Sequence, residues 1–342
     1  MFQNVNYEDI DKNRIDESHI LIDVRSPGEY ESETIPGAIN IPIFSDEERE
    51  KVGTIYVQES IERAKITGIE IVSKKLPELY EKISYLDKKY HNLIFFCARG
   101  GLRSSAIVSL FRTLGINSIK LDNGYKGYRR YINENLPKIL EDIEFIILYG
   151  NTGTGKTHIL EELQKEGMDI LDLEGCANHR GSLLGGVGLG KQNSQKMFES
   201  LVYDSLRKRK SNTVFVEGES KRIGKVIMPE YLYNATRNGK SIRIESPMEI
   251  RIDNILKDYV HETDDELIVA INYLRRNLGD KNIDRYIEMI KSSHYRVVIE
   301  ELMVKYYDPL YEYKDRTYDA IFENKDSKET AKELASWIVS SN

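Results

Sequence analysis

The feature that most constrains the fold of this chain is a glycine-rich segment, GNTGTGKT, at residues 150–157. It follows an apolar run at residues 145–149, which predicts a buried strand, and it leads into a helical pattern at residues 157–163. This order of strand, loop and helix is the context in which the Walker A pattern binds phosphate groups. The sequence therefore predicts an α/β domain that holds a phosphate-bearing ligand at this loop.

The residue types in this loop indicate how the phosphate groups would be held. Gly150, Gly153 and Gly155 let backbone N–H groups close around a diphosphate or triphosphate. Lys156 can reach the terminal phosphate oxygens, and Thr157 can coordinate a magnesium ion. The pattern predicts phosphate binding, which does not by itself establish nucleotide hydrolysis.

Acidic residues follow a second apolar run at residues 214–216. Glu217 and Glu219 occupy the place where domains of this kind put an acid near the metal ion, although the usual residue there is aspartate. Asp172 and Glu174 are open to the same interpretation. Mg²⁺ is therefore a candidate ligand, and an exposed acid at the end of a strand is the equal alternative.

A polar segment at residues 176–182 lies between these acidic positions and continues into a glycine-rich stretch. Such a segment is too polar for a core and is interpreted as a substrate-binding loop. Its candidate contacts are Asn178, His179 and Arg180, where His179 is either an acid/base group or a hydrogen-bonding residue. We interpret Cys176 as structural.

The length of 342 residues exceeds the size at which one hydrophobic core usually keeps growing, so at least two domains are expected. Apolar runs at residues 21–24 and 93–96 predict parallel strands of a separate N-terminal α/β unit. A polar, helix-like stretch interrupted by Pro137 follows, and charged amphipathic helices are expected from residue 264 onward. The predicted parts are an N-terminal domain (1–135), a connector (136–143), the phosphate-loop domain (144–263) and a helical C-terminal region (264–342).

Cys97 lies directly after the predicted strand at residues 93–96, in a loop that precedes a helical pattern at residues 104–114. Backbone N–H groups can converge there on a thiolate at the positive end of a helix, which lowers the thiol pKa. Gly100 and Gly101 shape this loop, and Arg99 and Arg103 add positive charge. The pattern predicts a nucleophilic cysteine in an anion-binding loop, rather than a buried structural thiol.

The spacing of five residues between Cys97 and Arg103 also occurs in cysteine phosphatases, where the arginine clamps a phosphate dianion. Two further segments, DVRSPGEY at residues 23–30 and IPGAINIP at residues 35–42, strongly resemble the N-terminal signatures of rhodanese domains. The resemblance implies a rhodanese-like fold for the predicted N-terminal domain. Because one phosphatase family shares that fold, the fold alone leaves the chemistry of Cys97 open.

Several segments in both halves of the chain together resemble the tRNA 2-selenouridine synthase family. The resemblance rests on residues 46–49, 52–54, 97–104, 124–129, 177–182, 219–224 and 306–311. It spans nearly the whole chain, and the order of the two domains also agrees. A rhodanese domain alone would be weak evidence, whereas its fusion to a phosphate-loop domain is specific.

The resemblance implies a transferase that replaces the sulfur of wobble 2-thiouridine in tRNA by selenium. Selenophosphate would be the selenium donor, and a selenophosphate supply enzyme would be a partner. An S-geranyl-2-thiouridine intermediate would form from geranyl diphosphate, so the phosphate loop would bind a diphosphate rather than use ATP. Cys97 would be the nucleophile or selenium carrier, with Arg99 and Arg103 as clamps for selenophosphate and Lys156 and Thr157 as diphosphate ligands.

Three other functions remain compatible with these residues. A rhodanese-type tRNA sulfurtransferase would use ATP to activate the base, and consumption of ATP would favour it. A phosphatase using the Cys97 loop would hydrolyse simple phosphate esters without tRNA. A tRNA-binding module without activity is poorly supported, because Cys97, Lys156 and Thr157 are all intact.

Composition limits the cellular setting and the mode of tRNA binding. The net charge of −7 argues against coating of nucleic acid by charge excess, so tRNA would use local basic clusters, for which residues 129–130, 207–210 and 275–276 are candidates. A solvated helix face is the alternative for each cluster. Only two cysteines are present, and we find no leader and no apolar run of membrane-spanning length, so we expect a cytoplasmic protein.

Overall fold

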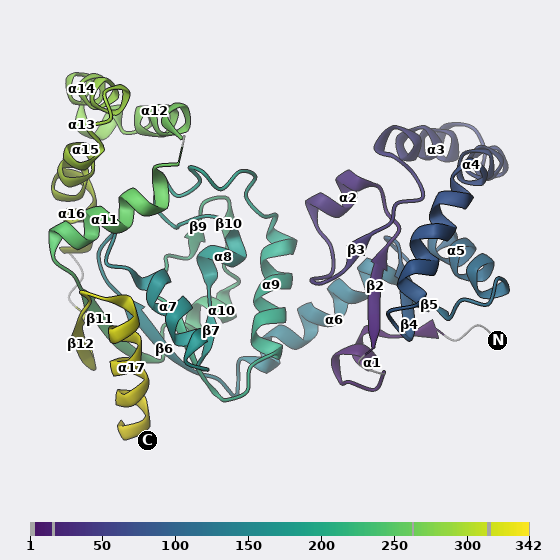
Figure 1. The fold of residues 1–342 in the computed structure, drawn as a ribbon, viewed down its shortest axis with the longest axis horizontal. Coiled ribbons are helices and arrows are strands. Elements are labelled where there is room, and N and C mark those ends of the chain that lie inside the picture. Colours follow the sequence, from purple (N-terminus) through teal and green to yellow (C-terminus); the bar gives the residue numbers. More distant parts are fainter. Residues whose placement is uncertain (1–3, 16–17, 262, 313–315, 342) are drawn as a thin grey trace. The chain divides into compact units, whose positions relative to one another are not determined.

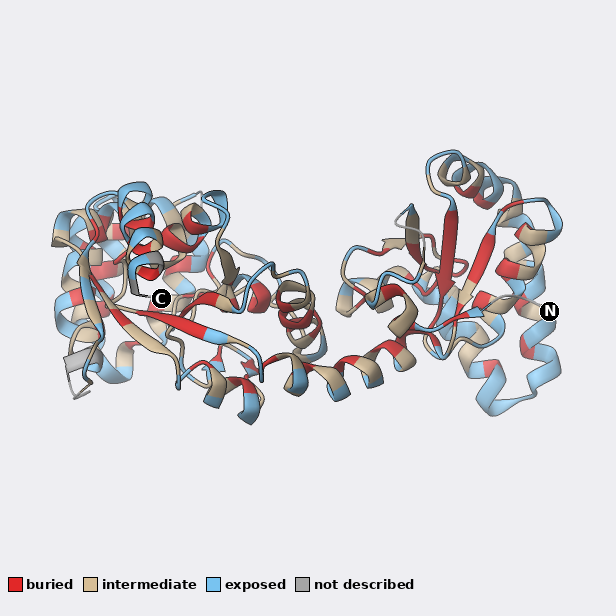
Figure 2. Cartoon of the chain, turned by 90° about the horizontal axis from the view of Figure 1, so that it is seen from below, coloured by how far each residue is buried: buried red, intermediate tan, exposed pale blue. Residues whose placement is uncertain are grey.

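The computed structural model describes residues 4–15, 18–261, 263–312 and 316–341. The chain divides into two compact units, residues 1–136 and 137–342. The boundary falls inside helix α6 (Gly124–Ile139), which continues through Pro137. Buried residues line the strands of each unit, so each unit has a core of its own (Figures 1 and 2).

Unit 1 is built on a parallel sheet in which the strand order is β1-β5-β4-β2-β3. Its strands are β1 (Asn4–Val5), β2 (His19–Asp23), β3 (Ile39–Asn40), β4 (Asn92–Phe96) and β5 (Ser118–Leu121). Its helices besides α6 are α1 (Tyr7–Asp11), α2 (Pro27–Ser32), α3 (Asp46–Gln58), α4 (Ile61–Asp87) and α5 (Leu102–Thr113).

The central strand β4 is buried along its whole length, as expected for a parallel strand covered on both faces. Phe95 packs in one core cluster with Ile107 and Phe111 of α5. These contacts hold the start of α5 close to the end of β4. The loop between them, which contains Cys97, is therefore fixed at both ends by the core.

Unit 2 contains a second parallel sheet, in the order β12-β11-β6-β8-β7. Its strands are β6 (Glu144–Tyr149), β7 (Asp169–Leu171), β8 (Thr213–Glu217), β11 (Lys240–Glu245) and β12 (Ala320–Glu323), with a small antiparallel pair β9 (Arg222–Ile223) and β10 (Val226–Ile227). Its helices are α7 (Lys156–Lys165), α8 (Leu173–Ala177), α9 (Gln195–Arg207), α10 (Glu230–Ala235), α11 (Met248–Tyr259), α12 (Asp264–Asn272), α13 (Arg275–Leu278), α14 (Asp280–Lys291), α15 (Tyr295–Leu302), the π-helix η1 (Met303–Tyr307), α16 (Pro309–Glu312) and α17 (Ser327–Ser341).

Two packing cores organise unit 2. Helices α7 and α17 cover one face of the sheet, where Leu160 and Leu334 share a cluster with Ile146 of β6. Helices α11, α12, α14 and α15 form a second core of their own beside the sheet (Figure 1). The loop after β6 lies next to both cores, because α7 belongs to the first and the loop residue Thr152 shares a cavity wall with the second.

The structure confirms two α/β units built on parallel sheets, of which the second contains the glycine-rich loop between β6 and α7. The prediction that the chain is purely helical after residue 264 was wrong for residues 320–323, which form β12 and pair with β11. This strand is only four residues long and half exposed, and its apolar run of three residues, 320–322, is too short to distinguish a strand from a helix. No helix among the described residues is long and apolar enough to cross a membrane.

Candidate active site

Cys97 lies at the carboxyl end of β4, and only 3% of its surface is exposed. The loop turns at Gly100, which has a positive φ of 61°. A second glycine, Gly124 at the start of α6, packs directly against this loop, and a Cβ there would lie 2.1 Å from the Cys97 carbonyl oxygen. The loop is also held by the Tyr125 and Lys126 amides, which donate to the carbonyls of Cys97 and Ala98.

The surroundings of the Cys97 sulfur favour the thiolate. Burial by itself would raise its pKa, but hydrogen bonds from the Ser104 hydroxyl and amide, with the charge of Arg103, bring the pKa below the ordinary cysteine value. The Ser104 Oγ lies 3.3 Å from the Cys97 Sγ. The thiolate is the reactive form of cysteine, so these contacts are compatible with the predicted nucleophile.

The two arginines of this loop have different environments. Arg103 donates to both carboxylate oxygens of Glu29, at 2.6 Å and 3.3 Å, so part of its charge is already neutralised. Arg99 is exposed, and no ion pair to it occurs among the described residues. Arg103 is therefore held beside the loop by Glu29, and Arg99 is the freer cation.

A buried ion pair that the sequence did not reveal supports the same loop. Arg25 donates to Asp23 at 2.7 Å, and both side chains are almost fully buried. The guanidinium of Arg25 also lies over the ring of Tyr125, 4.5 Å from its centre. Because Tyr125 is hydrogen-bonded to Cys97, this pair connects the first signature segment to the Cys97 loop.

The glycine-rich loop of unit 2 runs from the end of β6 to the start of α7. Gly153 and Gly155 both have positive φ values near 80°, which a side chain would oppose. The Lys156 Nζ donates to the Gly150 carbonyl at 2.9 Å, so the ammonium group lies over the loop. All five predicted phosphate ligands are thus in one compact turn.

Side chains from distant parts of the sequence hold this loop in shape. The Arg251 Nε donates to the Thr152 carbonyl at 2.9 Å, and its other nitrogens form an ion pair with Asp308. Asn254 and Asn324 donate to the Gly153 and Thr154 carbonyls, each at 2.8 Å. Sequence reasoning missed these four residues because they lie about 100 or more positions from the loop they contact.

Three glutamates lie beside the glycine-rich loop and differ in their burial and hydrogen bonds. Burial, followed by the charge of Glu219, raises the pKa of Glu174 to about 8. Glu217 is fully buried, and burial also raises its pKa. One Glu217 oxygen accepts from the Glu174 amide at 2.8 Å, and the other has no hydrogen-bond partner among the described residues. Thr157 donates to Glu174 at 3.3 Å.

Oxygen atoms that could contact Mg²⁺ lie beside the phosphate loop. No group of three histidine, cysteine or acidic side chains among the described residues is arranged to hold a metal ion. The Thr157 hydroxyl and the carboxylates of Glu174 and Glu219 are nevertheless oxygen ligands beside the phosphate loop, and Mg²⁺ commonly completes its shell with phosphate oxygens and water. Of the two predicted acids, Glu219 lines the cleft and Glu217 does not.

A cleft of about 450 Å³ joins these elements. Its walls include Lys156, Thr157, Glu174, Arg180 and Glu219. Neither Asn178 nor His179 lines it among the described residues.

The predicted substrate loop is held mostly by its own contacts. Asn178 ends α8 in the left-handed conformation and donates to the carbonyls of Leu189 and Lys191. Arg180 donates to the Val187 carbonyl at 2.8 Å and stacks on Tyr259. Burial, followed by the charge of Arg180, lowers the pKa of His179. Asn178 therefore shapes the loop, and Arg180 is the member of the predicted trio that reaches the cleft.

Comparison with known proteins identifies the family. Residues 143–341 match the model of the tRNA 2-selenouridine synthase AAA domain, and residues 6–131 match the rhodanese-like domain. A tRNA 2-selenouridine synthase of Nitrosomonas europaea is 36% identical over 71% of this chain. The chain belongs to the tRNA 2-selenouridine synthase family. A relative from Pseudomonas fluorescens with the same name is 29% identical over 89% of this chain and 90% of its own length.

The lengths matched differ within the tRNA 2-selenouridine synthase family. The match to the Nitrosomonas europaea relative covers 64% of that protein, slightly under two thirds of its length. Among solved structures, the N-terminal domain of a Clostridium difficile 630 protein, described as ATP/GTP-binding, is 39% identical, with a TM-score of 0.36. It covers 38% of this chain and 98% of that domain.

The basic clusters of this tRNA 2-selenouridine synthase family member are partly neutralised. Arg207 and Lys208 both pair with Asp204, and Arg275 pairs with Asp280 and Asp284. Cys176 is buried, and burial raises its pKa, which fits the structural role expected of it.

Proposed function

We propose that this chain replaces the sulfur of wobble 2-thiouridine in tRNA by selenium, in two steps that use geranyl diphosphate and selenophosphate. The name of the relatives supports the overall reaction. The observation that carries the proposal is the presence, in one chain, of a cysteine hydrogen-bonded to Ser104 at a helix start and a cleft that contains the glycine-rich loop.

The first step would take place at the glycine-rich loop. Backbone N–H groups, Lys156 and Thr157 would hold the diphosphate of geranyl diphosphate. The sulfur of 2-thiouridine would attack the first carbon of the geranyl group, and diphosphate would leave. Lys156 is well placed to stabilise the charge that develops on the leaving diphosphate, because its ammonium lies over the loop. ATP has no part in this scheme.

The alkylated sulfur would then be a better leaving group. Selenium delivered from selenophosphate at the Cys97 loop would attack the base carbon, and geranyl thiol would leave. Cys97 would be the nucleophile toward selenophosphate, and Arg99 would contribute positive charge for its phosphate group. Arg103, anchored by Glu29, would orient rather than carry the anion.

Mg²⁺ would be an accessory ion in this scheme. Thr157, Glu174 and Glu219 are the residues that would contact it beside the diphosphate. Bound there, it would neutralise phosphate charge and would also relieve the repulsion between the two carboxylates.

Mass spectrometry of nucleosides tests the proposal. Transfer RNA that contains 2-thiouridine is incubated with the protein, selenophosphate and geranyl diphosphate, with parallel reactions that contain Cys97→Ala, Lys156→Ala, or ATP in place of geranyl diphosphate. We expect 2-selenouridine with the intact protein, S-geranyl-2-thiouridine with Cys97→Ala, and neither product with Lys156→Ala. An unchanged base with the intact protein would refute the proposal, and a base modified only with ATP would favour a sulfurtransferase.

A further inference from the structure

An apolar cavity lies inside the helical core of unit 2, among side chains of α11, α12, α14, α15 and η1. Its walls are almost wholly apolar, and its volume is about 50 Å³. Two tyrosines in the wall have hydroxyls that are already paired: Tyr295 donates to Asp264 at 2.8 Å, and the Tyr259 hydroxyl lies 3.3 Å from the Ser182 hydroxyl. The rings of these two tyrosines contribute apolar surface to the wall.

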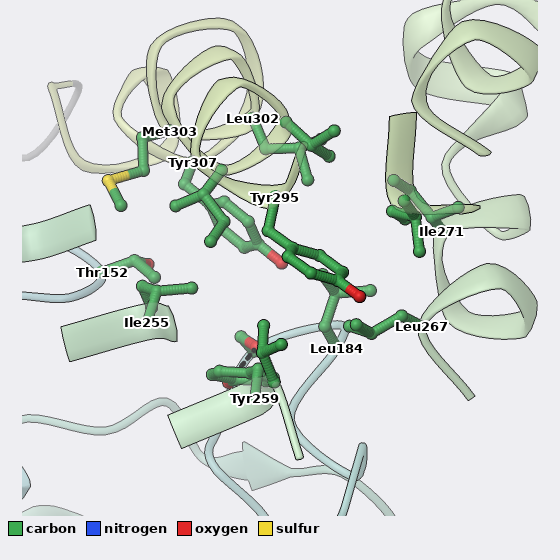
Figure 3. A pocket seen from close by; sticks show the side chains of 15 residues that line it. Thr152, Leu184, Ile255, Tyr259, Leu267, Ile271, Tyr295, Leu302, Met303 and Tyr307 are labelled. Atoms are coloured by element: carbon green, nitrogen blue, oxygen red, sulfur yellow. Dashed lines mark hydrogen bonds between the residues drawn. The ribbon is translucent and has the colours of Figure 1, made fainter. Parts of the chain in front are cut away.

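The cavity borders the phosphate cleft. Five residues line both spaces, namely Thr152, Ser182, Ile255, Tyr259 and Tyr307. Figure 3 shows Thr152 and Ile255 at one end of the cavity and Ile271 with Leu267 at the other. A ligand with its phosphate groups at the glycine-rich loop could therefore extend an apolar part past Thr152 toward Ile271.

The chemistry of the walls limits what that apolar part can be. A nucleoside would bring base edges and ribose hydroxyls into a space with almost no polar partner, which is unfavourable. A hydrocarbon chain has no such groups and gains by leaving water. The end opposite Thr152 is bounded by Ile271 and Leu267, buried members of the core that are 1% and 8% exposed.

We propose that this cavity binds the hydrocarbon chain of a prenyl diphosphate and that Ile271 limits the length of that chain. This inference rests on the proposed function for its ligand class, but it assigns a site and a selectivity residue of its own. Because Ile271 lies at the end of the cavity opposite Thr152, a fifteen-carbon chain would press against it more than a ten-carbon chain does.

Calorimetric binding to the full chain, without tRNA, tests the inference separately from the transfer reaction. The probes are inorganic, geranyl and farnesyl diphosphate. We expect geranyl diphosphate to bind about 100-fold or more tightly than inorganic diphosphate, because several methylene groups leave water. Equal affinities would overturn the inference, even if tRNA were geranylated. Tight binding without transfer would contradict only the proposed function.

Two substitutions of Ile271 test the length limit. Ile271→Ala should raise the affinity for farnesyl relative to geranyl diphosphate by about 10-fold, since it removes the buried end wall. Ile271→Phe should weaken geranyl binding and leave inorganic diphosphate unchanged. The matched control is Ile283→Ala, because Ile283 is fully buried in the same core and lies outside the cavity wall. If Ile271→Ala and Ile283→Ala changed the ratio of farnesyl to geranyl affinity equally, the effect would come from a general loss of core packing, and Ile271 would not limit chain length.

A second inference comes from the Cys97 loop and is independent of the cavity. Attack of a thiolate on the selenium of selenophosphate would leave the bonding electron pair on phosphorus and release phosphite. Attack on phosphorus instead sends that pair to selenium, releases selenide and forms S-phosphocysteine. Water then releases phosphate and restores the thiolate, so no oxidant or reductant is needed.

The loop geometry points to attack on phosphorus. Five residues separate Cys97 from Arg103, which is held in place by its ion pair with Glu29. The Ser104 hydroxyl lies 3.3 Å from the Cys97 sulfur. A hydroxyl in that position can stabilise the thiolate when it departs from a phosphorylated intermediate. We infer that Cys97 takes the phosphoryl group of selenophosphate and that Ser104 assists its hydrolysis. The inference rests on selenophosphate as the substrate.

Phosphorus NMR of the tRNA-free reaction distinguishes the two routes. We expect phosphate as the product with the intact protein and with Ser105→Ala, the neighbouring control, and no consumption above background with Cys97→Ala. Ser104→Ala should accumulate phosphorylated Cys97, detected by mass spectrometry of acid-quenched protein. Phosphite as the product, or no phosphocysteine in Ser104→Ala, would overturn the inference. A lack of reaction with the intact protein would instead contradict selenophosphate as the substrate.

Discussion

Glu174 lies beside two other glutamates at the phosphate loop, and its protonation should make the stability of the protein depend on pH. Its pKa of about 8 in the folded state lies above the value of 4.5 for an unperturbed glutamate. The folded state therefore holds the proton more tightly than the unfolded state, and stability falls as the pH rises from about 4.5 to about 8.

Substitution of Glu174 by Gln removes this titration. We expect the melting temperature of Glu174→Gln to rise relative to the unmodified protein between about pH 5 and about pH 8, with no further change above that range. Scanning calorimetry across this range measures the difference. Glu161→Gln, at another acidic position in the cleft wall, is the control. A difference that does not vary with pH would contradict the assignment.

Asn324 is a buried residue that should act by positioning the phosphate loop. Its amide donates to the Thr154 carbonyl at 2.8 Å, and its oxygen accepts from Thr330 at 3.1 Å. Loss of this support leaves a buried carbonyl without a partner, at a cost of about 1–3 kcal/mol. For Asn324→Ala we expect KM for geranyl diphosphate to rise about 10-fold with a smaller change in kcat.

Steady-state geranylation of 2-thiouridine tRNA measures both constants for Asn324→Ala. Asn282→Ala serves as the control, since the Asn282 amide caps a helix in the other core of unit 2. If KM stayed unchanged while the protein became less stable, Asn324 would have only a structural role.

At the scale of elements, the start of α6 and the Cys97 loop form one structural unit. A Cβ at Gly124 would lie 2.1 Å from the Cys97 carbonyl oxygen, and the residue also has a positive φ. Gly115 at the end of α5 has a positive φ as well, but open space surrounds it. A side chain at Gly115 would therefore introduce backbone strain alone, whereas a side chain at Gly124 would introduce strain and also collide with the Cys97 loop.

We expect Gly115→Ala to cost about 1 kcal/mol of stability and to leave selenium transfer intact, because only strain is introduced. Gly124→Ala should cost more and should slow the Cys97 step by at least about 10-fold, because the loop must move. Chemical denaturation and selenation of pre-geranylated tRNA provide the two readouts. Equal selenation rates for Gly115→Ala and Gly124→Ala would show that the contact between α6 and the Cys97 loop does not matter for the reaction.

Local signals explain which elements could be predicted from the sequence. The glycine-rich loop and the Cys97 loop each follow a continuous apolar run, so β6, α7, β4 and α5 were all predicted within a few residues of their ends. Strand β12 has an apolar run of only three residues and is stabilised by pairing with β11, so it was missed. The cavity was also beyond prediction, because its walls come from helices whose mutual packing no local pattern encodes.

The site residues also divide into those with a local sequence signal and those that contact the site from distant parts of the sequence. Glycine and lysine in the phosphate loop act through short-range geometry, and the sequence pattern was sufficient to locate them. Arg251 and Asp308 lie 57 positions apart and act together on the Thr152 carbonyl and Asn151. A single sequence has no signal for such a contact. Glu29, which binds Arg103 from 74 positions away, is a further example.

At the scale of the whole molecule, the two proposed half-reactions belong to two compact units, each with its own sheet and core. The Cys97 loop is in unit 1 and the glycine-rich loop is in unit 2. If the geranylated tRNA can leave one protein molecule and bind another, the two half-reactions do not need to occur in the same chain.

A mixture of Cys97→Ala and Lys156→Ala proteins should therefore restore 2-selenouridine formation that neither variant shows alone. The first variant would supply S-geranyl-2-thiouridine tRNA, and the second would carry out the Cys97 step on it. Nucleoside mass spectrometry measures the product, and activity of Lys156→Ala on pre-geranylated tRNA is the control. If that control works and the mixture still yields only geranylated tRNA, the intermediate stays on the chain that made it, and the two units act on one bound tRNA.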